Sequence, residues 1–276
     1  MCSVWCSNFF GSGLKTALLN TALADAGGAS EAQCADPSSL SSKAMTLTYV
    51  PAAGNFTNAG TYVDGSGAPQ LRVHCLKKGS FDMHDPVTVI RDGAGGKVLA
   101  AVRASTGMTE DVFHLYRAAP SYEGQEPLEG AAHAFAGYDL AQVGLGERCF
   151  LWAQVDTQRG LSAARNAFRL VQQGGALSEQ PLYRGEKFSA MSFYAQVTAG
   201  GEGGEGGAGA STEGSAAAAA AAVVVAKAQT GPGKCNNNPV MEVAAGVDLV
   251  AVVCCCSFLV GSGGSAAGGL AGAGVV

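Results

Sequence analysis

The chain carries little charge, because only 14% of its 276 residues are Asp, Glu, Lys or Arg. Its 17 Lys and Arg are outnumbered by 22 Asp and Glu, which gives a formal net charge of −5. Nucleic-acid binding needs a basic stripe that neutralises phosphates, so we expect no nucleic-acid partner. The same shortage weakens, without excluding, binding to anionic lipid, where each basic residue contributes about 1 kcal/mol.

The nine cysteines lack the pattern of a disulfide framework or a zinc site, because their number is odd and no C-x2-C pair occurs. The N-terminal Met-Cys-Ser-Val-Trp-Cys lacks the basic start and apolar run of a signal peptide. We therefore expect reduced thiols in a cytoplasmic protein. N-myristoylation needs a glycine at position 2, where this chain has Cys2, so we do not expect that modification. Acylation of the thiol of Cys2 or Cys6 is a hypothesis.

Catalytic signatures are also missing. The sequence has no G-x-S-x-G nucleophile motif. Gly201–Gly206 fits G-x-G-x-x-G only within a glycine-rich stretch, without a surrounding βαβ unit. His84 and Asp85 form a pair that would need further His and Asp ligands to hold a metal. We therefore expect no enzymatic activity, no cofactor and no metal site.

Short β-rich runs separated by turn signals begin at Met45. Two of the clearest turns are Asp64-Gly-Ser-Gly67 and Asp92-Gly-Ala-Gly-Gly96, each between runs rich in Val, Ile or Tyr. Asp-Gly supplies residues that tolerate positive φ, so both units predict hairpins. Eleven strands are predicted, at residues 46–50, 61–63, 71–75, 87–90, 98–102, 112–116, 149–155, 167–171, 190–197, 223–229 and 239–244.

The composition divides the chain into four parts. Residues 1–43 are small, polar and alanine-rich, which predicts an N-terminal extension of low order. The strands predict a domain over 44–261, interrupted at 199–222 by a Gly/Glu and polyalanine insert of low complexity. A Gly/Ala tail follows at 262–276.

The run Leu249–Val260 carries no charge, so it belongs in a protein core or in a bilayer. Twelve residues are fewer than the roughly 20 that span a membrane, although no charge follows as far as Val276. The length favours burial. Asp248 stands at the start of the run, where a carboxylate caps free N–H groups and meets the positive end of a helix dipole.

The order of strands followed by an apolar helix resembles the LURP-one-related family, which shares the tubby C-terminal-like fold with tubby proteins and phospholipid scramblases. Similar segments are Tyr62–Gly67, Val89–Val98, Phe113–Arg117, Val224–Lys227 and Val243–Asp248. There are two departures within these segments. The family's tryptophan is replaced by Phe113, and its proline is replaced by Ala245.

The resemblance implies a mainly β fold, a closed antiparallel twelve-stranded barrel around a hydrophobic C-terminal central helix. A helix that is apolar on all sides is stable only when surrounded, and a closed barrel provides that enclosure. The expected residues of the central helix are Asp248, Leu249, Val252, Val253, Cys256, Phe258 and Leu259. The run Cys254–Cys256 is expected to act as compact core thiols, with palmitoylation or redox sensing as the alternative.

The expected function is that of a non-enzymatic adaptor, cytoplasmic and peripheral to the plasma membrane. The resemblance to tubby proteins implies a phosphoinositide head group as ligand, with Lys77 and Lys78 as candidate lipid-binding residues. The alternative is a scramblase-like membrane protein with residues 249–260 inserted in the bilayer. The sequence indicates no particular protein partner.

Overall fold

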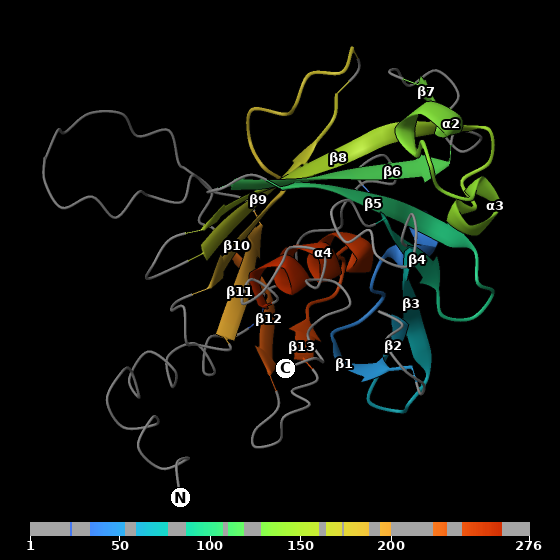
Figure 1. Cartoon of the computed structure of the whole chain (residues 1–276). Helices are drawn as coiled ribbons and strands as arrows, with labels where there is room; N and C mark the ends of the chain where they lie inside the picture. Colours follow the sequence, from blue (N-terminus) through green and yellow to red (C-terminus); the bar gives the residue numbers. More distant parts are fainter. Residues whose placement is uncertain are drawn as a thin grey trace, which may run out of the picture.

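The computed structural model describes residue 23 and residues 34–52, 59–76, 87–106, 110–118, 128–159, 164–172, 174–187, 194–199, 223–230 and 239–260. Within these residues, thirteen strands form one antiparallel sheet that closes on itself around a helix (Figure 1). The predicted fold class is therefore confirmed. The insert at 199–222 and the tail at 262–276 lie outside the described residues, apart from Ala199 at the end of a strand.

The elements follow the chain in a simple order. The strands are β1 (Met45–Pro51), β2 (Ala59–Val63), β3 (Pro69–Leu76), β4 (Val87–Asp92), β5 (Val98–Thr106), β6 (Glu110–Ala118), β7 (Leu128–Gly130), β8 (Arg148–Arg159), β9 (Ala164–Leu170), β10 (Tyr183–Lys187), β11 (Tyr194–Ala199), β12 (Val223–Thr230) and β13 (Pro239–Val243). The helices are η2 (Pro37–Ser39), α2 (Ala131–Ala134), α3 (Leu140–Val143) and α4 (Leu249–Val260).

Twelve of the strands make the closed barrel, and neighbours along the chain are neighbours in the sheet. β13 pairs with β1, and β6 pairs with β8, so the ring has no free edge there. The short β7 pairs with the first residues of β8 and adds a thirteenth strand beside the ring. Closure satisfies the backbone groups that an open sheet would leave exposed at its edges.

The two Asp-Gly units form the predicted hairpins, β2–β3 and β4–β5. The positive φ falls on a later glycine of each unit than the Asp-Gly pair suggested, with Gly67 at 85° and Gly96 at 71°. Gly93 is needed for another reason. A Cβ on this residue would lie 1.9 Å from the backbone oxygen of Pro69, so the turn after β4 can approach β3 only without a side chain.

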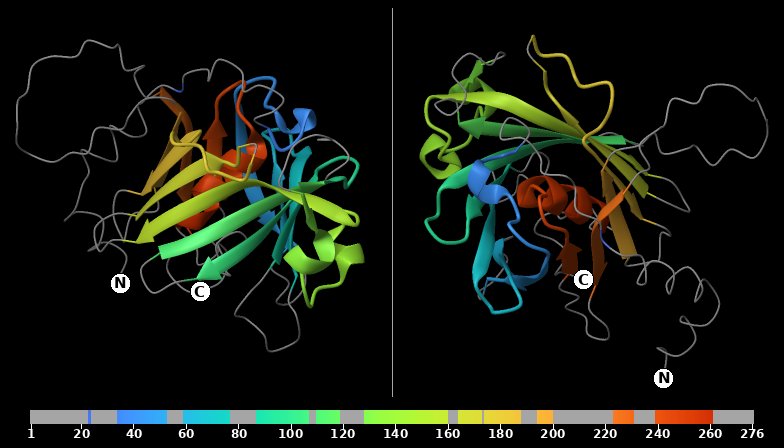
Figure 2. Two further views of the ribbon diagram at one scale, coloured as in Figure 1. Left: turned by 90° about the horizontal axis from the view of Figure 1, so that it is seen from above. Right: turned by 180° about the vertical axis from the view of Figure 1, so that it is seen from behind.

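Helix α4 lies inside the barrel, and Figure 2 shows strands surrounding it in both views. Every residue from Val250 to Cys256 is 0–1% exposed. Each buried valine contributes about 1.5–3 kcal/mol relative to an exposed one, which offsets the low helix propensity of β-branched residues. In the described part of the chain, no helix is both long and apolar enough to cross a membrane.

A second, smaller hydrophobic cluster covers the outside of β3–β6 and was not predicted from the sequence. α2 and α3 place Ala134, Phe135 and Val143 over outward-facing side chains such as Val89 and Tyr116. The rings of Tyr116 and Phe135 meet edge to face, with centroids 5.1 Å apart. This outer face of the barrel is therefore partly covered by the chain itself.

Residues 34–41 belong to the fold, although the sequence analysis placed them in an extension of low order. Cys34 and Ala35 are 0% and 3% exposed. The backbone of Ser41 exchanges hydrogen bonds with Val247 and Gly246, at 2.9 and 2.8 Å. The ordered part of the chain thus begins before the predicted boundary at residue 44. The polar composition concealed this, because the hydroxyls and the carboxylate here bond to the core.

Candidate functional site

The start of α4 carries a fully buried carboxylate, Asp248, which the sequence analysis expected at this position. Its Oδ1 accepts hydrogen bonds from the backbone N–H groups of Val250 (2.8 Å) and Ala251 (3.1 Å). Its Oδ2 accepts from the Ala35 backbone N–H and from the Ser39 hydroxyl (3.0 Å for the hydroxyl). Asp248 therefore caps α4 and joins it to the segment before β1.

Burial raises the pKa of Asp248 to about 6, and the hydrogen bonds from Ala35, Ala251, Ser39 and Val250 oppose that shift. Since a buried carboxylate without donors is destabilising, these four donors are what allow an acidic residue at this position.

A buried arginine, Arg117, shares this end of the barrel and was not singled out from the sequence. It is 1% exposed, and its guanidinium carbon lies 5.0 Å from the ring centroid of Trp152 and 5.4 Å from that of Phe150. Burial lowers the pKa of Arg117 to about 9, and the charges of Asp248 and Asp36 limit the fall. The sequence did contain a signal for its burial. Phe113, Leu115 and Arg117 stand at alternate positions of β6, so Arg117 shares the inward face of the two apolar residues.

Asp36 extends the same electrostatic cluster toward solvent. Its carboxylate accepts from the Ser38 backbone N–H (3.0 Å) and forms an ion pair with Lys97, whose side chain is 58% exposed. Burial would raise the pKa of Asp36, but the Lys97 and Ser38 hydrogen bonds outweigh it and lower the pKa overall. Asp36, Ser39 and Asp248 thus bond the N-terminal segment to α4 and to Lys97, and the Arg117 guanidinium is near enough for its charge to act on both carboxylates.

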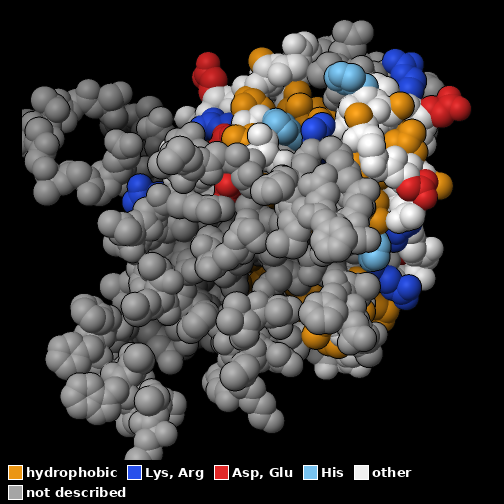
Figure 3. Space-filling view, viewed as in Figure 1, with side chains coloured by type: hydrophobic (Ala, Val, Ile, Leu, Met, Phe, Trp, Pro, Cys, Tyr) orange, Lys and Arg blue, Asp and Glu red, His pale blue; other side chains and the backbone are white. Residues whose placement is uncertain are grey.

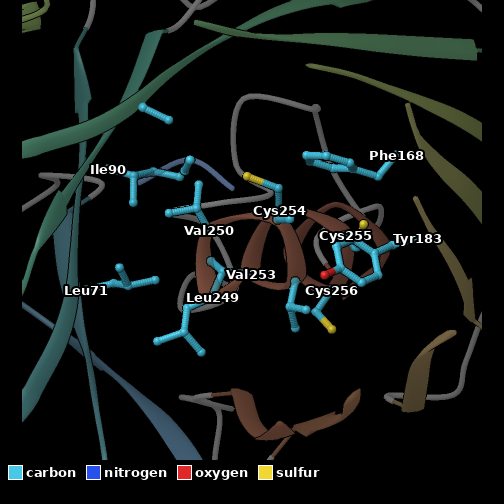
Figure 4. Close-up of a cluster of buried hydrophobic side chains, with 14 of the residues drawn as sticks. Leu71, Ile90, Phe168, Tyr183, Leu249, Val250, Val253, Cys254, Cys255 and Cys256 are labelled. Atoms are coloured by element: carbon cyan, nitrogen blue, oxygen red, sulfur yellow. The ribbon is translucent and has the colours of Figure 1, made fainter. Parts of the chain in front are cut away.

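The remaining predicted residues of the central helix lie along α4. Leu249 is 4% exposed, Val252 and Val253 are 0%, and Cys256 is 1%. Figure 4 shows Leu249 and Val250 on the side of α4 toward β3 and β4, where Leu71 and Ile90 stand. Phe258 and Leu259 belong to the helix, but their side chains are outside the described residues.

The three consecutive cysteines point in different directions around α4, and Cys255 lies beside Tyr183 (Figure 4). Burial raises the pKa of Cys256 to about 12 and those of Cys254 and Cys255 well above the usual value. The thiolate is the reactive form of cysteine, so burial disfavours reaction of these thiols in the folded protein.

The candidate lipid-binding residues Lys77 and Lys78 lie outside the described residues, directly after Leu76 at the end of β3. On the outer face of β3, Arg72 and His74 are exposed. Arg72 stands opposite Arg91 of β4 in the strand register. Arg91 donates to the backbone oxygens of Gly96 (3.1 Å) and Gln142 (3.0 Å), which fixes its guanidinium.

Elsewhere on the described surface, charges of both signs are interspersed, as Figure 3 shows for one face. Ion pairs join Arg165 to Glu186 and Lys227 to Glu242, at 3.3 and 3.7 Å. Among the described residues, no three His, Cys, Asp or Glu side chains converge on a possible metal position. The pair Arg72–Arg91 therefore stands out as two like charges placed directly opposite each other.

Comparison with known proteins adds no assignment. No protein-family description, no curated protein and no solved structure matches this chain.

Proposed function

We propose that this chain is a tubby-like barrel protein of the LURP-one-related type, which acts as a non-enzymatic adaptor at the cytoplasmic surface of the plasma membrane. Its ligand is a phosphoinositide head group bound on the outer face of β3 and β4. The buried α4 supports an external site, because its side chains and those of the strands occupy the barrel interior. A ligand the size of a head group is accommodated outside.

The observation that carries the proposal is the register pair Arg72–Arg91. Directly opposite residues of an antiparallel pair have Cβ atoms about 4.5–5.5 Å apart, and like charges at that distance are destabilising. A bound phosphate removes this repulsion and accepts from both guanidinium groups, whose planar donors suit phosphate oxygens. Arg91 is already oriented by two backbone oxygens, so little side-chain freedom remains to be lost on binding.

Lys77 and Lys78, the lipid-binding candidates expected from the sequence, lie outside the described residues and stay part of the proposal. They follow Leu76, which pairs with Val87 at the end of the β3–β4 ladder, beyond the exposed His74. We propose that the lysines contact a further anionic head group of the same membrane. The proposal thus joins the lysines predicted from the sequence to a pair of arginines that the register brings together.

The alternative scramblase-like function requires residues 249–260 to enter the bilayer. That step would break the four hydrogen bonds to Asp248 and expose the interior side chains that surround α4. We therefore keep this alternative as an outcome of the test.

The test is sedimentation with vesicles of phosphatidylcholine alone, with phosphatidylserine, or with a phosphoinositide. We expect binding to phosphoinositide vesicles to weaken at least tenfold in Arg72→Ala/Arg91→Ala and in Lys77→Ala/Lys78→Ala. The control is Arg165→Ala, an exposed basic residue on β9 that is ion-paired with Glu186. Absence of binding by the unchanged protein, or equal loss in the control, contradicts the proposal. Resistance of bound protein to alkaline carbonate supports the scramblase-like alternative.

A further inference from the structure

A second group of buried polar side chains lies inside the barrel, near the C-terminal half of α4. Asp111 and Thr157 are each 2% exposed, and Asn166 is 4% exposed. The register places Asp111 opposite Thr157, and Thr157 opposite Asn166. Since opposite residues have Cβ atoms about 4.5–5.5 Å apart, the three side chains form one continuous row across β6, β8 and β9.

This row faces the barrel interior. Residues two positions away on the same strands, Phe113, Val155 and Phe168, belong to the interior core. Side chains of a strand alternate between its two faces, so the polar row shares that inward face. It also lies near the barrel rim, because each of its residues is within three positions of a strand end.

Two oxygens in the row lack a hydrogen-bond donor: Thr157 Oγ1 and Asn166 Oδ1. The Asn166 amide is not free to rotate, because its Nδ2 donates to the backbone oxygen of Cys255 at 2.8 Å. That contact requires the N–H₂ group to face the helix, which leaves Oδ1 as an acceptor with no donor. Buried polar groups are normally satisfied, so two orphaned oxygens side by side call for an occupant.

The chemistry of the row indicates what this occupant is. A carboxylate, a hydroxyl and an amide oxygen are hard ligands, of the kind that Ca²⁺ binds. The next position in the row, Gly185 of β10, adds no side chain beside Asn166. Mg²⁺ demands a stricter octahedral geometry, whereas Ca²⁺ accepts flexible sets of oxygen ligands and waters.

We propose that Asp111, Thr157 and Asn166 form a binding site for a calcium-class cation inside the barrel rim. The cation satisfies the two orphaned oxygens and links β6, β8 and β9 to α4 through Asn166. Water completes its coordination, since Ca²⁺ takes six to eight oxygen ligands. The site is independent of the proposed lipid surface.

The test is the melting temperature of the full-length protein in chelator, and then in Ca²⁺, Mg²⁺, Na⁺ or K⁺ at constant ionic strength. Isothermal titration calorimetry with Ca²⁺ gives the affinity. We expect Ca²⁺ to raise the melting temperature more than the other ions do, and Asp111→Asn to weaken Ca²⁺ binding at least tenfold. Asp156→Asn is the matched control, because it removes an equal charge from the adjacent outward-facing position, where Asp156 pairs with Arg169.

Thr157→Val tests the same site if Asp111→Asn fails to fold. In chelator we expect this variant to melt at a higher temperature, because it removes a buried hydroxyl without a partner. In Ca²⁺ we expect its increase in melting temperature to be smaller than that of the unchanged protein. The proposal is overturned if Ca²⁺ does not raise the melting temperature of the unchanged protein. It is also overturned if Asp111→Asn and Thr157→Val both retain the full increase.

Discussion

At the scale of single residues, Asp248 does more than cap a helix. One carboxylate satisfies two backbone N–H groups of α4, the backbone of Ala35 and the hydroxyl of Ser39. An ordinary cap contributes about 0.5–2 kcal/mol. Here its loss also leaves buried donors without an acceptor, each at a cost of about 1–3 kcal/mol.

We therefore expect Asp248→Ala to lower the free energy of unfolding by about 3 kcal/mol or more. Asp139→Ala is the control, because Asp139 caps the short α3 from an exposed position and accepts from Ala141 N–H at 3.0 Å. That change should cost about 1 kcal/mol or less. Urea unfolding followed by tryptophan fluorescence measures the free energy of unfolding of both variants. Equal losses would show that Asp248 contributes no more than an exposed helix cap such as Asp139.

The raised pKa of Asp248 gives stability a pH dependence of definite sign. Its carboxyl has a pKa of about 6 in the fold, against an ordinary 3.8, so the folded state binds the proton more tightly. The stability that the protonated Asp248 contributes is fully present below about pH 4 and is lost as the pH rises through 6. Two pKa units correspond to about 3 kcal/mol.

The pH dependence of Asp248 is isolated by comparing the free energy of unfolding of the unchanged protein and of Asp248→Asn between pH 4 and 7. We expect the difference between them to change across that range. The lowered pKa of Asp36 acts in the opposite direction in both proteins and cancels in the comparison. A constant difference would mean that Asp248 titrates with an unshifted pKa.

At the scale of elements, the two Asp-Gly hairpins look alike in sequence but depend on their glycines differently. In the β2–β3 turn, Asp64 accepts from Ser66 and Ala68 N–H at 2.8 and 3.0 Å, and a Cβ on Gly65 would meet nothing within 4 Å. The corresponding residue of the β4–β5 turn is Gly93, whose Cβ would collide with the backbone of Pro69. Only the second unit presses its turn against a neighbouring strand.

This difference predicts opposite responses to the same substitution. Gly93→Ala should cost about 2 kcal/mol or more, because backbone rather than a flexible side chain must move. Gly65→Ala should be neutral within about 0.5 kcal/mol, or slightly stabilising through reduced freedom of the unfolded chain. Thermal unfolding of the two variants side by side checks this, and a similar loss for both would contradict the placement of the β4–β5 turn.

The elements that the sequence predicted are those with strong local signals. Alternation and Asp-Gly turns located β1–β6, and a wholly apolar run located α4. β10 was missed because Tyr183 is followed at the next inward position by Gly185, so Tyr183-Arg-Gly-Glu-Lys187 shows no alternation of large apolar side chains. The register Arg72–Arg91 and the row from Asp111 to Asn166 could not be predicted, because each depends on the pairing of separate strands.

At the scale of the whole molecule, closure is a long-range event. β1 pairs with β13, so the two halves of the barrel join only after nearly the entire described chain is in place. The segment of residues 34–41 then bonds to the start of α4, with Leu40 bridging Asp248. Ring closure, the N-terminal segment and the central helix are therefore parts of one interior, and we expect them to unfold together.

The central claim is that α4 stays inside the barrel and that ligands meet the protein from outside. The most direct measurement is the rate at which Cys254, Cys255 and Cys256 react with a maleimide, read by mass spectrometry, in buffer and on phosphoinositide vesicles. We predict that all three remain unlabelled in both conditions while the protein is folded, and react fully in denaturant. Labelling of the native protein, or protection in buffer that is lost on vesicles, would contradict this account.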